Sequence, residues 1–307
     1  MSLKLALIGI TGKKSGGAFA KLIIEHIDEI KAMFPDGIKI IIRKKSDTTK
    51  LEMLLPHAEI CYSDSDKENC YEDLLSDVDT VINVAGISLS KKISLAAAKN
   101  SVRRLILVHT TGIYSKHKAA GELYREIDAF VTKVCQDNNI VLTICRPTMI
   151  YGNIYDRNIV KFIKLVDMFP ITPIVSNAMY KLQPVHYEDL AEAYFSILIN
   201  EEKTANKNYI LSGGEEIYLK DILKIIGAKL GKKVRFISCP FIIAYIGAWC
   251  LYLCTFRKKD YREKVQRLCE DRCYSYEDAA MDFGYKPRAF HEGIAEEVSQ
   301  YLELKNK

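Results

Sequence analysis

Residues 3–20 read LKLALIGITGKKSGGAFA, a short apolar run followed by a glycine-rich turn and the start of an amphipathic segment. The apolar run predicts a buried β-strand, and Gly9, Gly12 and Gly16 allow the backbone to turn sharply. A helix that begins directly after such a turn directs its free amide groups and the positive end of its dipole at the turn. The stretch therefore predicts a dinucleotide-binding turn over which a pyrophosphate lies.

The composition is that of an ordinary globular protein. The chain has 307 residues, of which 49% are hydrophobic, and its net charge of +5 is spread along the sequence. This length permits one large domain or two unequal ones, and the spread charge gives no support for a nucleic-acid partner. Nine cysteines without regular spacing, and no cleavable signal expected before the first strand, indicate a reducing, cytoplasmic compartment.

Two cysteine pairs have helical spacing. Cys250 and Cys254 are four residues apart, as are Cys269 and Cys273, so each pair would share one face of a helix. No histidine lies close by, and structural zinc sites usually have tighter ligand spacing. We therefore expect ordinary buried or half-buried thiols and no metal.

A second strand, residues 38–42, ends in Arg43, Lys44 and Lys45 after a crossover helix predicted over residues 16–32. In a dinucleotide fold the end of this strand meets the adenosine ribose. An acid there would accept the 2′-hydroxyl, whereas a basic residue would accommodate a 2′-phosphate. Arg43 and Lys44 thus favour NADP over NAD, and the alternative is a solvated basic turn.

Strands and helices continue to alternate along the first half of the chain. The strand over residues 80–86 is almost wholly apolar, and its end at Ala85 and Gly86 leaves room for a ligand. The pattern predicts further strands at 58–62, 105–114 and 141–145, and helices at 67–76, 90–100 and 116–137. Such alternation predicts an α/β fold, a Rossmann-type doubly wound parallel sheet with right-handed crossovers.

Beyond residue 152 the alternation breaks down and prolines become frequent. We predict a dinucleotide-binding domain over residues 1–152 and a smaller, mixed C-terminal substrate lobe over residues 153–307, interwoven with the sheet. Helices are expected near 260–270, 276–282 and 290–303.

Residues 241–256 form an uncharged stretch of sixteen residues. As a helix it would extend roughly 24 Å, which is too short to cross a bilayer core of about 30 Å. We expect a buried or substrate-covering helix. The alternatives are an interfacial helix anchored at a membrane by Arg257, Lys258 and Lys259, or the face of a homodimer.

Motifs along nearly the whole chain resemble those of the extended or atypical short-chain dehydrogenase/reductase superfamily, in particular its NAD(P)-dependent sugar-nucleotide epimerases and dehydratases. Ser63 and Asp64 are similar to the element that touches adenine, and Arg146 and Pro147 to the exit of the sixth strand. Further similar motifs are Gly9 to Gly12, Val81 to Gly86, Ile150 to Gly152, Pro184 to Ala191 and Asp278 to Pro287.

The resemblance implies which residues bind the cofactor. Family members space their glycines three apart, but here Ser15 stands in the third place and Gly16 follows one residue late. The longer turn carries Lys13 and Lys14, which suits an atypical, NADP-preferring loop. The residues implied are Gly9, Thr11, Gly12, Lys13, Lys14, Ser15, Gly16, Arg43, Lys44, Asp64, Ser65, Ala85, Gly86, Arg146 and Pro147.

The resemblance also implies a catalytic Thr, Tyr and Lys. Thr110 or Thr111 can take the place of the family's Ser or Thr, and Thr110 is favoured because it lies four residues before Tyr114. Counting back from Arg146 identifies Tyr124 as the base, but Asp128 stands where the family has its Lys. The alternative register pairs Tyr114 with Lys118, and a third possibility is that no tyrosine is catalytic.

The family's activity implies hydride transfer at a carbinol carbon of a nucleotide sugar. One alternative is a dinucleotide-binding sensor or assembly module that has lost the Tyr–Lys chemistry, as Asp128 suggests. Another is a reductase of a lipid-linked or steroid-like substrate at a membrane surface, as the uncharged stretch suggests.

Overall fold

The computed structural model describes residues 2–51, 54–64, 67, 69–117, 119, 121–258 and 260–306. Its centre is a seven-stranded sheet in the order β11-β6-β5-β4-β1-β2-β3, in which every neighbouring pair is parallel. This arrangement confirms the predicted doubly wound α/β fold. The strands are β1 (Leu5–Ile8), β2 (Ile38–Arg43), β3 (Ala58–Ser63), β4 (Thr80–Asn83), β5 (Arg104–Val108), β6 (Val141–Pro147) and β11 (Asn208–Leu211).

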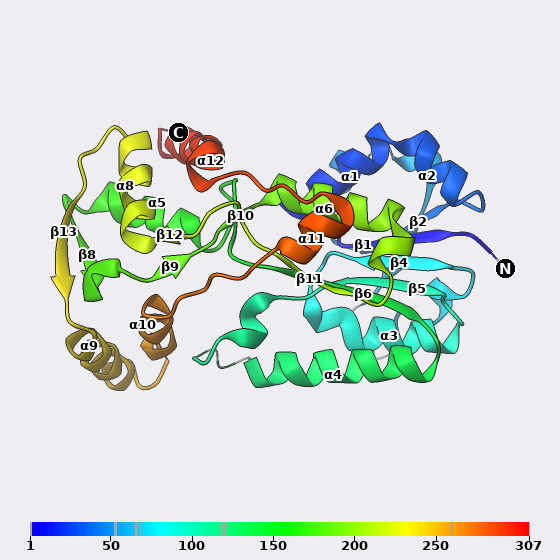
Figure 1. The fold of residues 1–307 in the computed structure, drawn as a ribbon, viewed down its shortest axis with the longest axis horizontal. Coiled ribbons are helices and arrows are strands. Elements are labelled where there is room, and N and C mark those ends of the chain that lie inside the picture. Colours follow the sequence, from blue (N-terminus) through cyan, green and yellow to red (C-terminus); the bar gives the residue numbers. More distant parts are fainter. Residues whose placement is uncertain are drawn as a thin grey trace.

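Helices cover both faces of this sheet, as Figure 1 shows. On one face α1 packs against α6, and on the other α3 packs against α4. Because both faces are covered, the central strands β1, β4 and β5 are buried along their whole length. The covering helices are α1 (Ser15–Glu25), α2 (Ile27–Met33), α3 (Ser90–Lys99), α4 (Gly121–Asp137), α6 (Tyr187–Ile199), α7 (Glu201–Thr204) and α11 (Glu277–Phe283).

Four predicted elements differ from the structure. The helix expected over 16–32 is two helices, because His26 has a non-helical backbone and lies against Phe195. The described part of 67–76 contains only the 3-10 turn Asp73–Leu75. The helix expected from residue 116 begins at Gly121, and β5 gives way after Val108 to a 3-10 turn at Thr111–Tyr114.

The remaining chain forms a second lobe beside the sheet's carboxyl edge (Figure 1). Its apolar core joins α5, α8 and α12 through residues such as Ile163, Ile222 and Ile294. Pairs of short strands connect these helices: β7 with β10, β9 with β12, and β8 with β13. The elements are β7 (Ile150–Tyr151), α5 (Ile159–Met168), β8 (Ile171–Val175), β9 (Lys181–Leu182), β10 (Val185–His186), β12 (Ile217–Tyr218), α8 (Leu219–Lys229), β13 (Arg235–Cys239), α9 (Phe241–Cys254), α10 (Arg262–Leu268) and α12 (Phe290–Lys305).

The chain returns from this lobe to the sheet. β11 lies beside β6 as an edge strand, and α6 covers the sheet. Buried Arg104 of β5 fixes the returning segment, because its guanidinium donates to the carbonyls of Leu198 at 2.8 Å and Ile197 at 2.7 Å. Sequence position alone therefore does not separate the sheet from the lobe, and the boundary at 152 stays a prediction.

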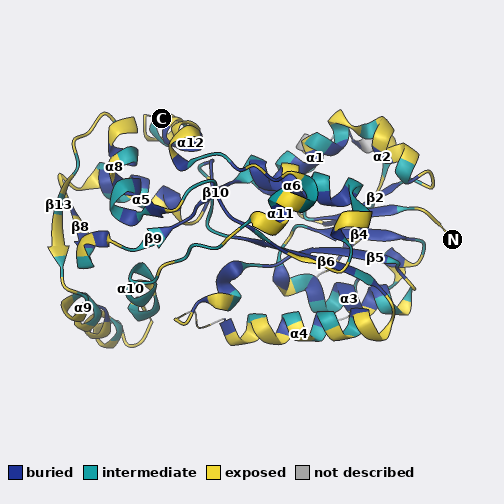
Figure 2. Ribbon diagram, viewed as in Figure 1, coloured by how far each residue is buried: buried dark blue, intermediate teal, exposed yellow. Residues whose placement is uncertain are grey.

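The uncharged stretch forms α9, and the prediction that this helix is buried is wrong, while its covering of a substrate stays a prediction. Of its residues only Ala248 is buried, and Figure 2 shows the helix exposed at the end of the lobe. Cys250 and Cys254 are exposed as well, contrary to the expectation for these thiols. No helix in the described part of the chain is long and apolar enough to cross a membrane.

Candidate dinucleotide site

The glycine turn lies between β1 and α1, at the point where the strand order reverses. Gly9 follows β1 and Ala85 follows β4, its neighbour in the sheet. A Cβ on Gly9 would lie 2.4 Å from the Ala85 amide nitrogen, and Gly9 has a φ of +87°. A Cβ on Gly16 would lie 2.3 Å from the Gly9 carbonyl oxygen. Any side chain at these two positions would therefore push the turn apart.

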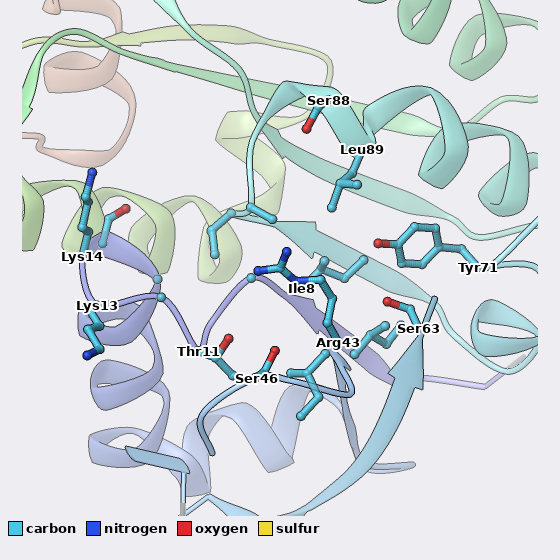
Figure 3. A pocket seen from close by; sticks show the side chains of 18 of the residues that line it. Ile8, Thr11, Lys13, Lys14, Arg43, Ser46, Ser63, Tyr71, Ser88 and Leu89 are labelled. Atoms are coloured by element: carbon cyan, nitrogen blue, oxygen red, sulfur yellow. The ribbon is translucent and has the colours of Figure 1, made fainter. Parts of the chain in front are cut away.

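A cavity of about 750 Å³ opens above this turn (Figure 3). Such a crevice at the carboxyl ends of parallel strands is the usual ligand site of a doubly wound sheet. Lys13 and Lys14 lie at one end of the view, and Ser63 and Tyr71 at the other. Its lining is Ile8, Gly9, Thr11, Gly12, Lys13, Lys14, Ser15, Gly16, Ile41, Ile42, Arg43, Ser46, Ser63, Tyr71, Val84, Ala85, Ser88, Leu89, Lys92, Ile150 and Arg157.

The cavity is cationic. Among the described residues that line it, five are Lys or Arg and none is Asp or Glu. Lys14 precedes α1 and supplies no side-chain acceptor to it, so the first amides of the helix are available to an anion. Burial lowers the pKa of the Lys14 amine, against the opposing effect of Asp156. The charge and the amides together suit a ligand with several phosphates.

Some predicted binding residues do not line this cavity. Lys44 and Asp64 are exposed outside it, and Gly86 and Pro147 lie beyond its lining. Arg146 is engaged with Asp128, and Ser65 lies outside the described residues. The other nine predicted cofactor residues all line the cavity, with Ser15 and Gly16 coming from the first turn of α1: Gly9, Thr11, Gly12, Lys13, Lys14, Ser15, Gly16, Arg43 and Ala85.

Sequence reasoning missed several lining residues. Ser46 follows the basic run at the end of β2, and Ser63 is the last residue of β3, so strand-end position could have identified both. Arg157 comes from the loop after β7 and carries no local motif. Its place in the cavity depends on the path of the second lobe over the sheet.

A second cavity, of about 170 Å³, lies where the lobe meets the carboxyl ends of β5 and β6. It adjoins the first, because residues next to each other in the chain line different cavities. Met149 and Asn158 line the small cavity, and their neighbours Ile150 and Arg157 line the large one. Its lining is polar and comprises Thr110, Thr111, Gly112, Ser115, Thr148, Met149, Asn158, Leu182, Gln183, Arg267, Arg272 and Tyr274.

Three groups in the small cavity can bind a polar ligand. The Thr110 hydroxyl accepts a hydrogen bond from the Gly112 amide at 3.0 Å, so its own hydrogen is available for donation. The Nε atoms of Arg267 and Arg272 are buried, with no hydrogen-bond partner among the described residues. Burial lowers the pKa of Arg272 to about 10, which leaves its guanidinium cationic at neutral pH. Arg267 and Arg272 had no local sequence signal.

Asp128 stands where the resembling family has its Lys, and it belongs to a buried polar network. Its carboxylate accepts two hydrogen bonds from Arg146, each at 2.8 Å, and lies 2.7 Å from His109 Nδ1. His109 Nε2 in turn lies 3.0 Å from the Ser90 hydroxyl. Burial opposes ionisation of Asp128, but the bonds from His109 and Arg146 outweigh it and hold its pKa at about 2.

The two candidate tyrosines lie elsewhere. Tyr124, in the first turn of α4, is half-buried against the apolar core under α3 and α4. Tyr114 is 47% exposed, and its ring centroid lies 5.5 Å from that of Tyr274. Neither tyrosine lines either cavity. Lys118, the partner expected for Tyr114, lies outside the described residues.

Metal coordination has no candidate in the described ranges. No group of three or more His, Cys, Asp or Glu side chains is placed there to hold an ion.

The fold, with its glycine turn at the reversal of strand order, defines a doubly wound protein of the dinucleotide-binding class. Residues 1–245 match the model of the NmrA-like family, and the chain belongs to that family. The match also supports membership of the extended short-chain dehydrogenase/reductase superfamily that the motifs resemble.

Individual relatives are distant. A UDP-glucose 4-epimerase of Vibrio cholerae is 20% identical over 295 residues, which cover 89% of this chain and 85% of that protein. The crystal structure of gox2253 is 18% identical and superposes with a TM-score of 0.75 over 99% of both chains. A Bacillus cereus UDP-glucuronic acid 4-epimerase, solved with NAD, is 13% identical with a TM-score of 0.72, covering 98% of this chain and 99% of that one. These similarities establish the shared fold.

The Asp128 network generates a stability prediction. Asp128→Asn leaves the Arg146 guanidinium, whose side chain is 5% exposed, without its anion, and we expect a loss of about 3 kcal/mol in the free energy of unfolding. Because the folded pKa of Asp128 is about 2, below its unfolded value, the loss is full above about pH 4 and shrinks as pH falls towards 2. Urea titrations at several pH values measure it.

Glu126→Gln is the matched control, because Glu126 pairs with Lys91 on the exposed side of the same helix. Its effect should stay within about 0.5 kcal/mol. An Asp128→Asn variant as stable as the control would contradict the assigned role of the network.

Proposed function

We propose that the protein is an NADP-preferring oxidoreductase of the epimerase or dehydratase type, acting on a nucleotide sugar by hydride transfer. The observation that carries this proposal is the pair of adjoining cavities: a large cationic one at the glycine turn and a small polar one containing Thr110 and two arginines. The first suits a dinucleotide, and the second suits the anionic part of a substrate.

The large cavity fits a dinucleotide along its length. The turn from Gly9 to Gly16 and the start of α1 would hold the pyrophosphate, with Lys13 and Lys14 close by. Ser63 and Tyr71, at the other end, would flank the adenosine. A bound nicotinamide dinucleotide supplies the hydride acceptor and donor for the reaction.

Preference for NADP rests on Arg43 and Ser46. Arg43 ends β2 and reaches into the cavity, as Figure 3 shows, and Ser46 lies beside it in the lining. A guanidinium and a hydroxyl suit a phosphate on the adenosine 2′-oxygen. The described lining has no carboxylate to accept a 2′-hydroxyl.

The substrate class follows from the small cavity. Arg267 and Arg272 would bind a diphosphate. Thr110 would donate a hydrogen bond to the hydroxyl on the sugar carbon that gives up the hydride. Two of the relatives described above are named as 4-epimerases of UDP-glucose and of UDP-glucuronic acid, which are substrates of this kind.

The proton acceptor is the step that departs from the resembling family. With Asp128 bonded to Arg146 and His109, position 128 provides no ammonium group to stabilise a tyrosinate at Tyr124. The candidate bases are then Tyr124 without the usual lysine, or Tyr114, and neither side chain lines either cavity. The same observation favours a second candidate function, a dinucleotide-binding sensor or assembly module without turnover.

Replacement of Arg43 tests the cofactor assignment. Arg43→Gln should raise the dissociation constant for NADPH at least about tenfold and change that for NADH by less than about threefold, because only NADPH carries the 2′-phosphate. Calorimetric titration measures both constants. Lys44→Gln is the control, since it removes the adjacent exposed charge outside the cavity, and equal effects of the two variants on NADPH would count against the assignment.

Turnover distinguishes the two candidate functions. During incubation with oxidised cofactor and a panel of nucleotide sugars, the protein should convert one of the sugars into a product. The rate of the Thr110→Ala variant should be at least about a hundredfold lower, because the substrate hydroxyl loses its hydrogen-bond donor. Nicotinamide absorbance and product chromatography measure the reaction. Tight cofactor binding without any product would instead support the sensor.

A further inference from the structure

Helix α9 is an apolar helix on the surface. Its fourteen residues carry no charge, and only Ala248 among them is buried. The helix lies at the far end of the second lobe, where it packs against α10 (Figures 1 and 2). An exposed apolar patch of this kind usually marks a surface that meets a partner or a membrane.

The apolar surface of α9 is wide. Ile242, Ile246, Trp249 and Leu253 recur at helical spacing on one side and are 68%, 54%, 47% and 43% exposed. Ile243, 60% exposed, lies about 100° further round the helix. The exposed apolar arc is therefore wider than the stripe that a single packed helix covers.

The side of α9 that faces the protein is different in character. Tyr252 is partly covered, and its ring centroid lies 4.3 Å from the Arg262 guanidinium carbon. Ala248 is the buried position on this side. The helix is thus held against the lobe by one face, while its apolar side chains project outward.

Basic residues follow the helix directly. Phe256 is 88% exposed, and Arg257 and Lys258 are exposed next to it. Lys259 follows in the sequence and lies outside the described residues. Apolar side chains, a tryptophan and adjacent lysine and arginine are the combination with which interfacial helices bind anionic lipid surfaces.

We propose that α9 and residues 256–258 form a binding surface for an anionic lipid bilayer. The outward side chains of α9 enter the boundary between head groups and acyl chains, and Arg257 and Lys258 contact lipid phosphates. The helix lies along the surface, because fourteen residues extend only roughly 21 Å against a hydrocarbon core of about 30 Å.

A second copy of the chain fits this surface less well. Pairing of two α9 helices would cover one stripe and leave Ile243 or its neighbours in water. α9 has no carboxylate to neutralise a partner's Arg257 and Lys258. A lipid surface covers the full apolar arc and neutralises the basic residues at once.

The surface is close to the small cavity in the fold. α9 packs against α10, which supplies Arg267 to that cavity. The proposal nevertheless does not depend on the proposed function, because vesicle binding needs neither cofactor nor substrate.

Trp249 is the protein's single tryptophan and reports on α9 directly. The full chain is titrated with two kinds of vesicle. One contains phosphatidylcholine alone, and the other contains phosphatidylcholine with about 30% of the anionic lipid phosphatidylglycerol. We expect a blue shift of Trp249 emission and quenching by brominated acyl chains with the anionic vesicles. Salt should weaken the binding.

Variants separate the contributions. Ile246→Glu should reduce vesicle binding at least about tenfold, and Arg257→Gln with Lys258→Gln about fivefold for each charge removed. Leu304→Glu, 56% exposed near the end of α12, is the matched control and should bind like the unmodified chain. Circular dichroism verifies that each variant is folded.

Two results would overturn the proposal. One is Trp249 emission that stays constant at every lipid concentration. The other is a blue shift that grows with protein concentration in the absence of lipid and disappears in Ile246→Glu, which would identify a homodimer face.

Discussion

The close approach of the first turn to the neighbouring strand is the constraint on which the dinucleotide cavity depends. Gly9 has no room for a Cβ beside Ala85, and Gly16 has none beside the carbonyl of Gly9. These contacts bring the end of β1 and the start of α1 against β4 at the reversal of strand order. The amides of α1, the end of β2 at Arg43 and the loop containing Arg157 then surround one space.

The second lobe completes both cavities. Residues 148–158 leave the carboxyl end of β6 and run between the two cavities, so neighbouring side chains of this segment line one cavity or the other. Asp156 caps α5 by accepting from the amides of Ile159 at 2.8 Å and Val160 at 2.7 Å, and Asn153 donates to the Lys13 carbonyl at 2.9 Å. This loop therefore links the glycine turn to the lobe that supplies Arg267 and Arg272.

The sheet was predictable because its signals are local. Apolar strands, helical periodicity and a glycine turn predicted β1, β2, β3, β4 and β6 close to their observed positions. The exposure of α9 was not predictable, because an apolar composition does not indicate whether another element covers the helix. The fate of Arg146 depended on Asp128, eighteen residues earlier, and Arg157 and Arg272 reach the cavities only through the path of the lobe.

A crystal structure of the protein with NADPH tests the central claim most directly. We predict the pyrophosphate over residues 9–16, the 2′-phosphate bound by Arg43 and Ser46, and the nicotinamide on the side of the cavity that adjoins Thr110. The complex would also show whether Tyr114 or Tyr124 approaches the nicotinamide ring. An adenosine phosphate bound away from Arg43, or no NADPH in this cavity at saturating concentration, would contradict the account.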